Sequence, residues 1–338
     1  MERSQRVVDS ERERLRVKGL SAAVASPSGV VWAGVSGQST EANRITPDML
    51  FGLGSVTKTY IAALIMQFVD EGAFSLDDPV GDWITKLGRI DPTIAIRRLL
   101  NHTSGLYRYQ IKPEYLAAIY QQPERVWAAQ EIVDEFQGEP NCKVDPGWGE
   151  SALDYVLLGM IIEKAAESTA SRVLRTRLLS PLGLDDTFLY PDEGYPVERM
   201  AHMWWAAAGA SEPVDVVAGA GERPLAGLFS SLWTSGALHA TASDLARFAQ
   251  ALFTGAVVSP RSLEEMLKPG PELGAGARYG YSVVIESSGG EPRYWHSGGA
   301  GYSSIFSYSP EQGQSVAVLC NQMVDLRPVA RALESAAA

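Results

Sequence analysis

The chain has 338 residues, of which 46% are hydrophobic and 20% are charged, and its formal net charge is −11. This length suits one large composite domain or two ordinary ones, and the composition is typical of a globular protein. The negative charge argues against nucleic acid or an anionic membrane as a partner, because both require a basic surface. No apolar run reaches the length of a membrane-spanning helix, so we expect no membrane partner.

The first twenty residues, MERSQRVVDSERERLRVKGL, predict an amphipathic helix and contain no apolar signal-peptide core. We therefore expect a cytoplasmic protein, unless a leader precedes this sequence. The two cysteines, Cys142 and Cys320, lack the spacing of metal ligands. Cys320, within SVAVLC, is expected to be a small core residue. The sequence implies neither a metal nor an organic cofactor.

The remaining elements alternate in character along the chain. SAAVASPSGVVWAGVSGQS predicts two strands around a Ser-Gly turn, and a strongly apolar helix follows from about residue 56 to 71, closed by Gly72. A long section that is mostly helix and loop comes next, and strands joined by glycine-rich turns follow it. This order predicts an α/β fold, with an antiparallel sheet made from both chain ends, flanked by helices, and an inserted all-helical subdomain. The expected division is 1–75 plus 236–338 for the sheet domain and 76–235 for the helical subdomain, with an active-site cleft between them.

The head of the apolar helix, within FGLGSVTKTYIAALIMQFVDEG, holds a serine and a lysine three residues apart. Residues at this spacing lie side by side on a helix, so Ser55 and Lys58 can touch. Burial lowers the pKa of a lysine, and a neutral amine can accept the proton of a serine that attacks a carbonyl. The helix N-terminus also favours an oxyanion. These features together favour acyl-transfer chemistry.

Two other interpretations of this segment exist. Ser-x-x-Lys is a loose pattern and also occurs by chance. GLGSVTKT nearly matches the nucleotide-binding pattern G-x-x-x-x-G-K-[ST], but Thr57 stands where that pattern requires its last glycine. Because this glycine lets the backbone wrap the phosphate, we do not favour a nucleotide site.

Further segments extend the pattern beyond this tetrad. FGLGSVTKTYIAALIMQFVDEGAFSLDDPV, RRLLNHTSGLY, DYVLLGMIIE, SGALHATASDLARFAQALFTG and YWHSGGAGYSS follow one another between about residues 20 and 322. In this order they resemble the serine β-lactamase and penicillin-binding-protein superfamily. The most similar branch is that of class C β-lactamases and D-alanyl-D-alanine carboxypeptidases, which includes esterases, D-aminopeptidases and acyltransferases. The resemblance implies the same α/β fold, with the site in the cleft.

The resemblance also implies roles for individual residues. Ser55 would be the acylated nucleophile and Lys58 its proton acceptor. The third family motif, Lys-Thr-Gly or His-x-Gly, corresponds here to His296, Ser297 and Gly298. His296 would line the site, or it is an ordinary strand residue. The backbone N–H groups of Ser55 and Gly299 would form the oxyanion hole, with Ser297 and Gly298 beside the substrate.

The second family motif, Tyr-x-Asn, is absent. By alignment with the central helix, Glu150 takes the position of the tyrosine and Ala152 that of the asparagine. Glu150 could replace the tyrosine as an acid or base, could only pair with Lys58, or could turn outward while Tyr107 or Tyr109 fills the gap. Losing the amide should weaken the grip on peptide-like substrates, which argues against classical penicillin hydrolysis.

The aromatic residues Tyr107, Tyr109 and Trp148, close to these motifs in sequence, are expected to contact substrate, whereas His102 in NHTSG is expected to brace a turn. The predicted function is a serine hydrolase that acts on an ester or amide of a small molecule through an acyl-enzyme. One alternative is an acyltransferase of small-molecule biosynthesis, which passes the acyl group to an amine or alcohol. Another is a binding protein, or an enzyme that uses the cleft for other acid–base chemistry.

Overall fold

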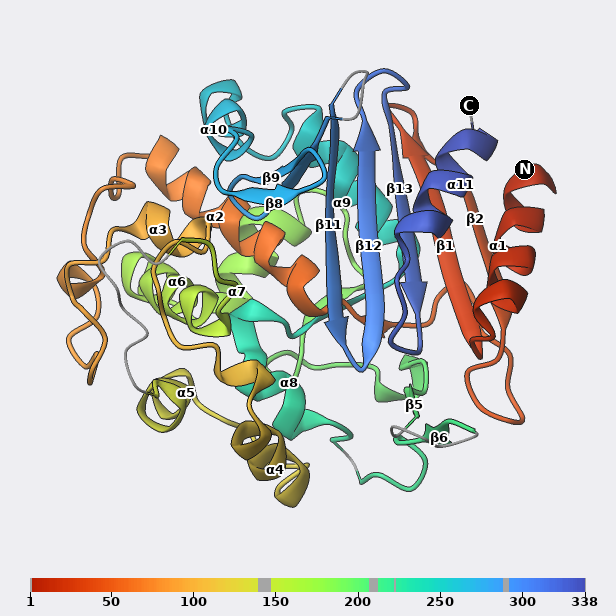
Figure 1. Cartoon of the computed structure of the whole chain (residues 1–338), viewed down its shortest axis with the longest axis horizontal. Helices are drawn as coiled ribbons and strands as arrows, with labels where there is room; N and C mark the ends of the chain where they lie inside the picture. The colour runs from red at the N-terminus through yellow and green to blue at the C-terminus, as the bar shows by residue number, and fades with distance from the viewer. Residues whose placement is uncertain (1, 139–146, 207–211, 222, 288–291, 338) are drawn as a thin grey trace.

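An eight-stranded antiparallel sheet built from both ends of the chain forms the centre of the molecule (Figure 1). The computed structural model describes residues 2–138, 147–206, 212–221, 223–287 and 292–337. In order across the sheet, the strands are β2 (Gly29–Gly37), β1 (Gly19–Ser26), β13 (Gln314–Cys320), β12 (Tyr302–Ser309), β11 (Arg293–Ala300), β10 (Val284–Glu286), β9 (Ala277–Tyr279) and β8 (Glu272–Gly274).

Helices cover both faces of this sheet. The terminal helices α1 (Glu2–Leu15) and α11 (Arg327–Ala337) lie side by side on one face (Figure 1), and α9 (Ala242–Phe253) packs on the other. Successive strand residues point to opposite faces, so a strand covered on both sides is apolar throughout. In β1, Ala22 belongs to the core beneath α1 and α11, whereas its neighbour Ala23 belongs to the larger core on the α9 side.

The predicted apolar helix is α2 (Thr57–Asp70), preceded by a short 3₁₀ turn, η1 (Gly54–Val56). Every residue of α2 from Thr57 to Met66 is buried, because the helix runs through the interior between the sheet and α6 (Ala152–Ala166). The chain leaves the helix through Gly72, whose φ of 72° is readily adopted by glycine. The turn η1 lies directly against β11, and this contact sets the position of the site.

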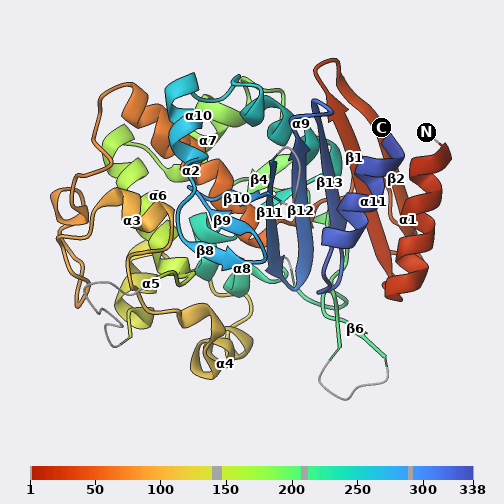
Figure 2. The same ribbon diagram turned by 45° about the horizontal axis from the view of Figure 1, so that its top comes forward.

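The section between the strands is largely helical. Its helices lie beside the sheet on the left of Figure 1 and around its lower end, and Figure 2 shows β6 below the sheet. The elements not yet given are α3 (Ile96–Leu100), α4 (Pro113–Gln121), α5 (Ala129–Phe136), α7 (Ala170–Leu174), α8 (Ala226–Leu232), α10 (Pro260–Met266), β3 (Phe51–Gly52), β4 (Thr187–Leu189), β5 (Trp204–Trp205), β6 (Val214–Asp215) and β7 (Leu238–Ala240).

The predicted fold class, an antiparallel sheet flanked by helices within an α/β chain, is confirmed. The domain boundaries drawn from the sequence stay a prediction. Cys320 is a free, buried cysteine at the end of β13, and Cys142 lies outside the described residues. Within the described part of the chain, no helix has both the length and the apolar character to cross a membrane.

Candidate active site

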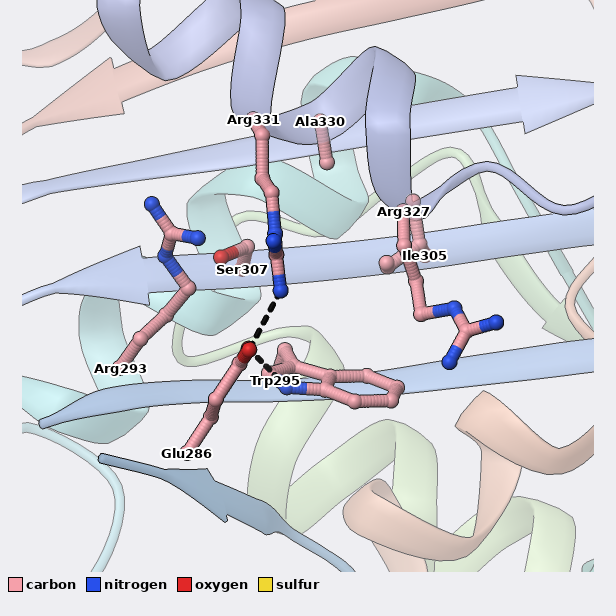
Figure 3. A pocket seen from close by; sticks show the side chains of 8 residues that line it. All are labelled: Glu286, Arg293, Trp295, Ile305, Ser307, Arg327, Ala330 and Arg331. Carbon is pink, nitrogen blue, oxygen red and sulfur yellow. Dashed lines mark hydrogen bonds and ion pairs between the residues drawn. The ribbon is translucent and has the colours of Figure 1, made fainter. Parts of the chain in front are cut away.

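Several hollows lie on the described part of the molecule, and two of them differ greatly in size. The smaller, of about 10 Å³, lies between α11 and the sheet (Figure 3) and has room for about one water molecule. Its arginines are already paired: Arg331 with Glu286, Arg293 with Glu334, and Arg327 with Asp325. Trp295 also donates its indole N–H to Glu286. We therefore interpret the residues around this hollow as a structural network of ion pairs and not as a binding site.

The larger cavity has a volume of about 560 Å³ and is lined by three of the four residues predicted to be catalytic, whereas His296 is not among the described residues that line it. Ser55, Lys58 and Glu150 lie together on its wall, and Gly299 of β11 lines it as well. A cavity of this size accommodates a small organic molecule. It is therefore the candidate active site.

Three side chains meet at the hydroxyl of Ser55. Its Oγ donates to Oε1 of Glu150 at 2.8 Å and accepts from Nζ of Lys58 at 2.8 Å. Nζ of Lys58 also lies 3.2 Å from Oε1 of Glu150. The hydroxyl proton is thus directed at a carboxylate, and a cation faces the oxygen that would become nucleophilic.

Lys58 is buried because it belongs to the interior helix α2, and its side chain is only 3% exposed. Its third contact is a donation to the backbone carbonyl of Ser235 at 2.9 Å, so all three ammonium hydrogens have an acceptor. Burial lowers the pKa of this amine, while the charges of Glu150 and Asp154 act in the opposite direction.

Glu150 immediately precedes α6, whose N-cap is Ser151. The backbone carbonyl of Glu150 accepts from Nε of Arg108 at 2.8 Å and from Nε2 of Gln110 at 2.9 Å, which fixes the chain at this point. Burial disfavours the charged carboxylate. The positive charges of Lys58 and the neighbouring histidines, together with the hydrogen bond from Ser55, outweigh burial and hold the pKa of Glu150 well below its ordinary value.

Two buried histidines stand behind this triad. Nε2 of His296 forms a 2.8 Å hydrogen bond with the hydroxyl of Tyr279, and burial lowers the pKa of His296 to about 4. Nδ1 of His102 lies 2.5 Å from the carboxylate of Asp154, and burial raises the pKa of that carboxyl. The second ring nitrogen of each histidine is buried without a partner among the described residues.

Glycines bring β11 against the serine. A Cβ placed on Gly298 would lie 2.0 Å from the carbonyl oxygen of Leu53 and 2.8 Å from the amide nitrogen of Ser55. A Cβ on Gly54 would lie 2.6 Å from the amide nitrogen of Gly299. No side chain fits at Gly54 or Gly298. Because glycine has no side chain, the backbone amides of Ser55 and Gly299 can approach one another.

The comparisons with known proteins identify the family of the chain. Residues 5–338 match the family model described as Beta-lactamase. The chain belongs to the beta-lactamase family. The resemblance inferred from its motifs is therefore confirmed.

Several relatives can be named. Penicillin-binding protein 4* of Bacillus subtilis is 29% identical over 85% of this chain, which spans 64% of that protein's own length. Esterase EstB of Burkholderia gladioli is 27% identical over 53% of this chain and 49% of its own. The crystal structure of D-amino acid amidase from Ochrobactrum anthropi SV3, in complex with L-phenylalanine, has a TM-score of 0.82 at 27% identity and covers 99% of this chain and 97% of its own.

Some of the residues predicted from the family motifs lie elsewhere. Tyr109 is buried in the core, packs against Tyr115, and donates to the carbonyl of Ser231 at 2.6 Å. Tyr109 is not among the described residues that line the cavity, whereas Tyr115 is. The hydroxyl of Tyr107 is directed to Glu114 at 3.2 Å.

Neither tyrosine therefore takes the place left by the family tyrosine, and the carboxylate of Glu150 turns inward to Ser55. Trp148 packs against the rings of His102 and Tyr279 and is not among the described residues that line the cavity. Ser297 is exposed on β11 and is likewise absent from that lining.

Other residues of the site carried too weak a sequence signal to be found. The contact of Lys58 with Ser235 uses a backbone carbonyl, which residue type does not reveal. Nε2 of Gln110 donates to the carbonyl oxygen of Glu150, and Oε1 of Gln110 accepts from the backbone N–H of Ala152. Gln110 therefore stabilises the segment in which the family's asparagine is missing. No group of three or more potential metal ligands occurs within the described ranges.

Proposed function

We propose that this protein is a serine hydrolase that cleaves an ester or amide of a small molecule through an acyl-enzyme on Ser55. One observation carries the proposal: the Ser55 hydroxyl is held between the carboxylate of Glu150 and the ammonium of Lys58 on the wall of a 560 Å³ cavity. Such a pairing of nucleophile, acceptor and cation is the arrangement that activates a serine.

In the first half-reaction, Oγ of Ser55 bonds to the substrate carbonyl carbon while its proton passes to Oε1 of Glu150. The carbonyl oxygen takes the negative charge and accepts from the backbone N–H groups of Ser55 and Gly299. The bond to the leaving group then breaks, and the proton on Glu150 passes to the departing alcohol or amine. Lys58 keeps its protons throughout and stabilises the developing alkoxide.

In the second half-reaction, water replaces the leaving group. Glu150 accepts a proton from the water as it attacks the acyl carbon, and it returns that proton to Oγ of Ser55 when the acyl group leaves. The low pKa of Glu150 keeps the carboxylate ionised down to acidic pH but also makes it a weak base, so the transfer depends on its direct contact with the Ser55 hydroxyl. On this proposal Glu150 performs the proton transfer that the tyrosine performs elsewhere in the family.

The names of the relatives support hydrolysis in general, without specifying a substrate. An esterase and an amidase are among the proteins that this chain resembles. Because ester and amide hydrolysis proceed through the same type of tetrahedral intermediate, the site described above suits either bond.

The test uses a small fluorophosphonate and p-nitrophenyl acetate, with the intact mass of the protein recorded beside that of a Ser55→Ala variant. We expect the wild-type protein to gain one fluorophosphonate adduct and to release p-nitrophenol, and the variant to do neither. A wild-type protein that remains unmodified and inactive would overturn the proposal, as would an adduct that persists in Ser55→Ala.

A further inference from the structure

Exposed apolar side chains gather at the mouth of the active-site cavity. Of nine large hydrophobic side chains that are exposed in the described part of the chain, five line this one cavity. A soluble surface rarely concentrates such residues unless they serve as a binding surface. The five are Ile111, Leu116, Tyr120, Trp205 and Met323.

Two helices continue this surface into the cavity. On α4, Tyr115, Leu116, Ile119 and Tyr120 line the cavity, a spacing of one and four residues that places them on one side of the helix. Tyr115 and Ile119 are buried, whereas Leu116 and Tyr120 are exposed, so the apolar wall runs from the interior to the rim.

The facing wall comes from α8. Leu225, Leu228 and Leu232 follow one another at spacings of three and four, so a single leucine ridge faces the cavity. All three leucines are half-buried. Since the remaining surface of each is available to a ligand, the ridge provides a hydrophobic contact surface.

The end of the sheet and the β5–β6 region close the third side. Figure 1 shows α4, α8 and β5 gathered below the turn between β11 and β12. Met203, Trp205 and Met323 line the cavity here, and methionine side chains adapt easily to ligands of different shape. The walls thus converge on Ser55 from three elements that are far apart in the sequence.

The charges of the lining exclude one class of substrate. Its charged side chains are Lys58, Arg108 and Glu150, and the one carboxylate already contacts Ser55 and Lys58. Among the described residues that line the cavity, no further acid can pair with a substrate ammonium group. A cationic substituent would therefore lose hydration in this cavity without gaining a partner.

We propose that this apolar wall is the binding subsite for a long or bulky uncharged hydrocarbon group carried by the substrate, on one side of the scissile ester or amide bond. The inference rests on the proposed function, since it concerns the same cavity. It assigns the leucine ridge of α8 and the inner side of α4 the role of selecting substrates by apolar size.

The experiment measures kcat/KM for two ester series at concentrations below micelle formation. One lengthens the acyl chain of p-nitrophenyl esters from acetate to octanoate, and the other lengthens the alcohol of alkyl acetates from ethyl to octyl. We expect kcat/KM to rise with chain length in one of them, by up to about fourfold per methylene group. From the shortest to the longest ester the rise should reach at least about 100-fold.

Variants at Leu228 connect this preference to the wall. Leu228→Trp should fill the cavity and reduce the long-to-short ratio of kcat/KM by about tenfold or more, and Leu228→Ala should move the preference towards bulkier chains. Leu263 of α10, also half-buried but outside the cavity lining, offers the matched control. Leu263→Ala and Leu263→Trp should keep the wild-type ratio, with thermal unfolding recorded for all four variants.

The outcomes separate this inference from the proposed function. If a small fluorophosphonate labels Ser55 but kcat/KM is flat in both series, the subsite inference is overturned and the hydrolase proposal stands. The subsite inference is also overturned if neither Leu228→Trp nor Leu228→Ala changes the long-to-short ratio of kcat/KM. If Ser55 is not labelled at all, both proposals fail together.

Discussion

Ser55 and Glu150 are 95 residues apart in the chain, yet the hydroxyl of one donates to the carboxylate of the other at 2.8 Å. This contact joins η1, at the head of the interior helix, to the segment that leads into α6. It requires Glu150 to be held in place by its own backbone, and Arg108 and Gln110 supply that support by donating to its carbonyl.

Glu150→Gln should lower kcat/KM by about 100-fold to 10,000-fold, the range expected when a general base is lost. A glutamine keeps the size of the side chain and can still bond to Ser55, but it cannot accept the serine proton. We expect the thermal unfolding midpoint to change much less than activity. The measurement is p-nitrophenyl ester hydrolysis beside a thermal melt.

The matched control for this prediction is Glu264→Gln on α10. Glu264 is exposed and is not among the described residues that line the cavity. Its activity should equal that of the wild-type protein. Turnover by Glu150→Gln at the wild-type rate would identify Lys58, and not Glu150, as the proton acceptor.

Local geometry explains which parts of the site could be predicted from sequence. Ser55 and Lys58 are three residues apart at the start of a helix, so their contact follows from helix geometry alone. The inward turn of Glu150 did not follow from sequence, because it depends on hydrogen bonds from a loop forty residues earlier. The structure excludes the outward orientation of Glu150, while the choice between a catalytic acid or base and a simple ion pair with Lys58 stays a prediction.

His296→Ala should reduce kcat/KM more than it reduces stability. His296 is buried beside the triad, and its imidazole contributes to the electrostatic environment of Glu150. A loss of about tenfold to 100-fold in kcat/KM is expected, with a modest fall in the unfolding midpoint. Tyr279→Phe, which removes only the hydroxyl bonded to His296, serves as the comparison and should be milder. A large fall in the midpoint with nearly unchanged kcat/KM would make His296 a structural residue.

Gly298→Ala should abolish most activity, because the added methyl group would lie 2.0 Å from the carbonyl oxygen of Leu53 and must push β11 away from η1. The oxyanion site between Ser55 and Gly299 would then be widened, and overpacking of this kind also costs about 1–3 kcal/mol of stability. Gly194→Ala is the control, since nothing lies within 4 Å of a Cβ at Gly194. Wild-type kcat/KM in Gly298→Ala would show that this close approach is not needed.

The fold was easier to predict than the cavity. The strand-forming segments at both ends of the chain and the strongly apolar helix are local patterns, and they predicted the correct architecture. The apolar wall, by contrast, exists only because α4 packs beside α8, which is more than a hundred residues later in the chain. For the same reason the sequence could not show that Tyr109 is buried in the core against Tyr115, since tertiary packing decides which side chains of a loop are covered.

His239 should make the protein less stable as the pH falls, and His239→Phe should remove that effect. The ring lies among Tyr190, Tyr195 and Phe229, and burial lowers the pKa of His239 to about 3. Between the ordinary histidine pKa of about 6.5 and this value, the unfolded chain binds a proton that the folded chain does not, so the free energy of unfolding decreases as the pH drops.

The change from pH 7.5 to 5 amounts to about 2 kcal/mol for a single histidine. Asp244 acts in the opposite sense, because burial raises its pKa to about 6, so the two variants of the chain must be compared with one another and not with a calculated curve. Urea unfolding of the wild-type protein and His239→Phe at both pH values measures the difference. The prediction is wrong if the wild-type protein and His239→Phe lose the same free energy of unfolding on acidification. In that case His239 accepts a proton in the folded protein as readily as in the unfolded chain, and its aromatic surroundings do not keep it neutral.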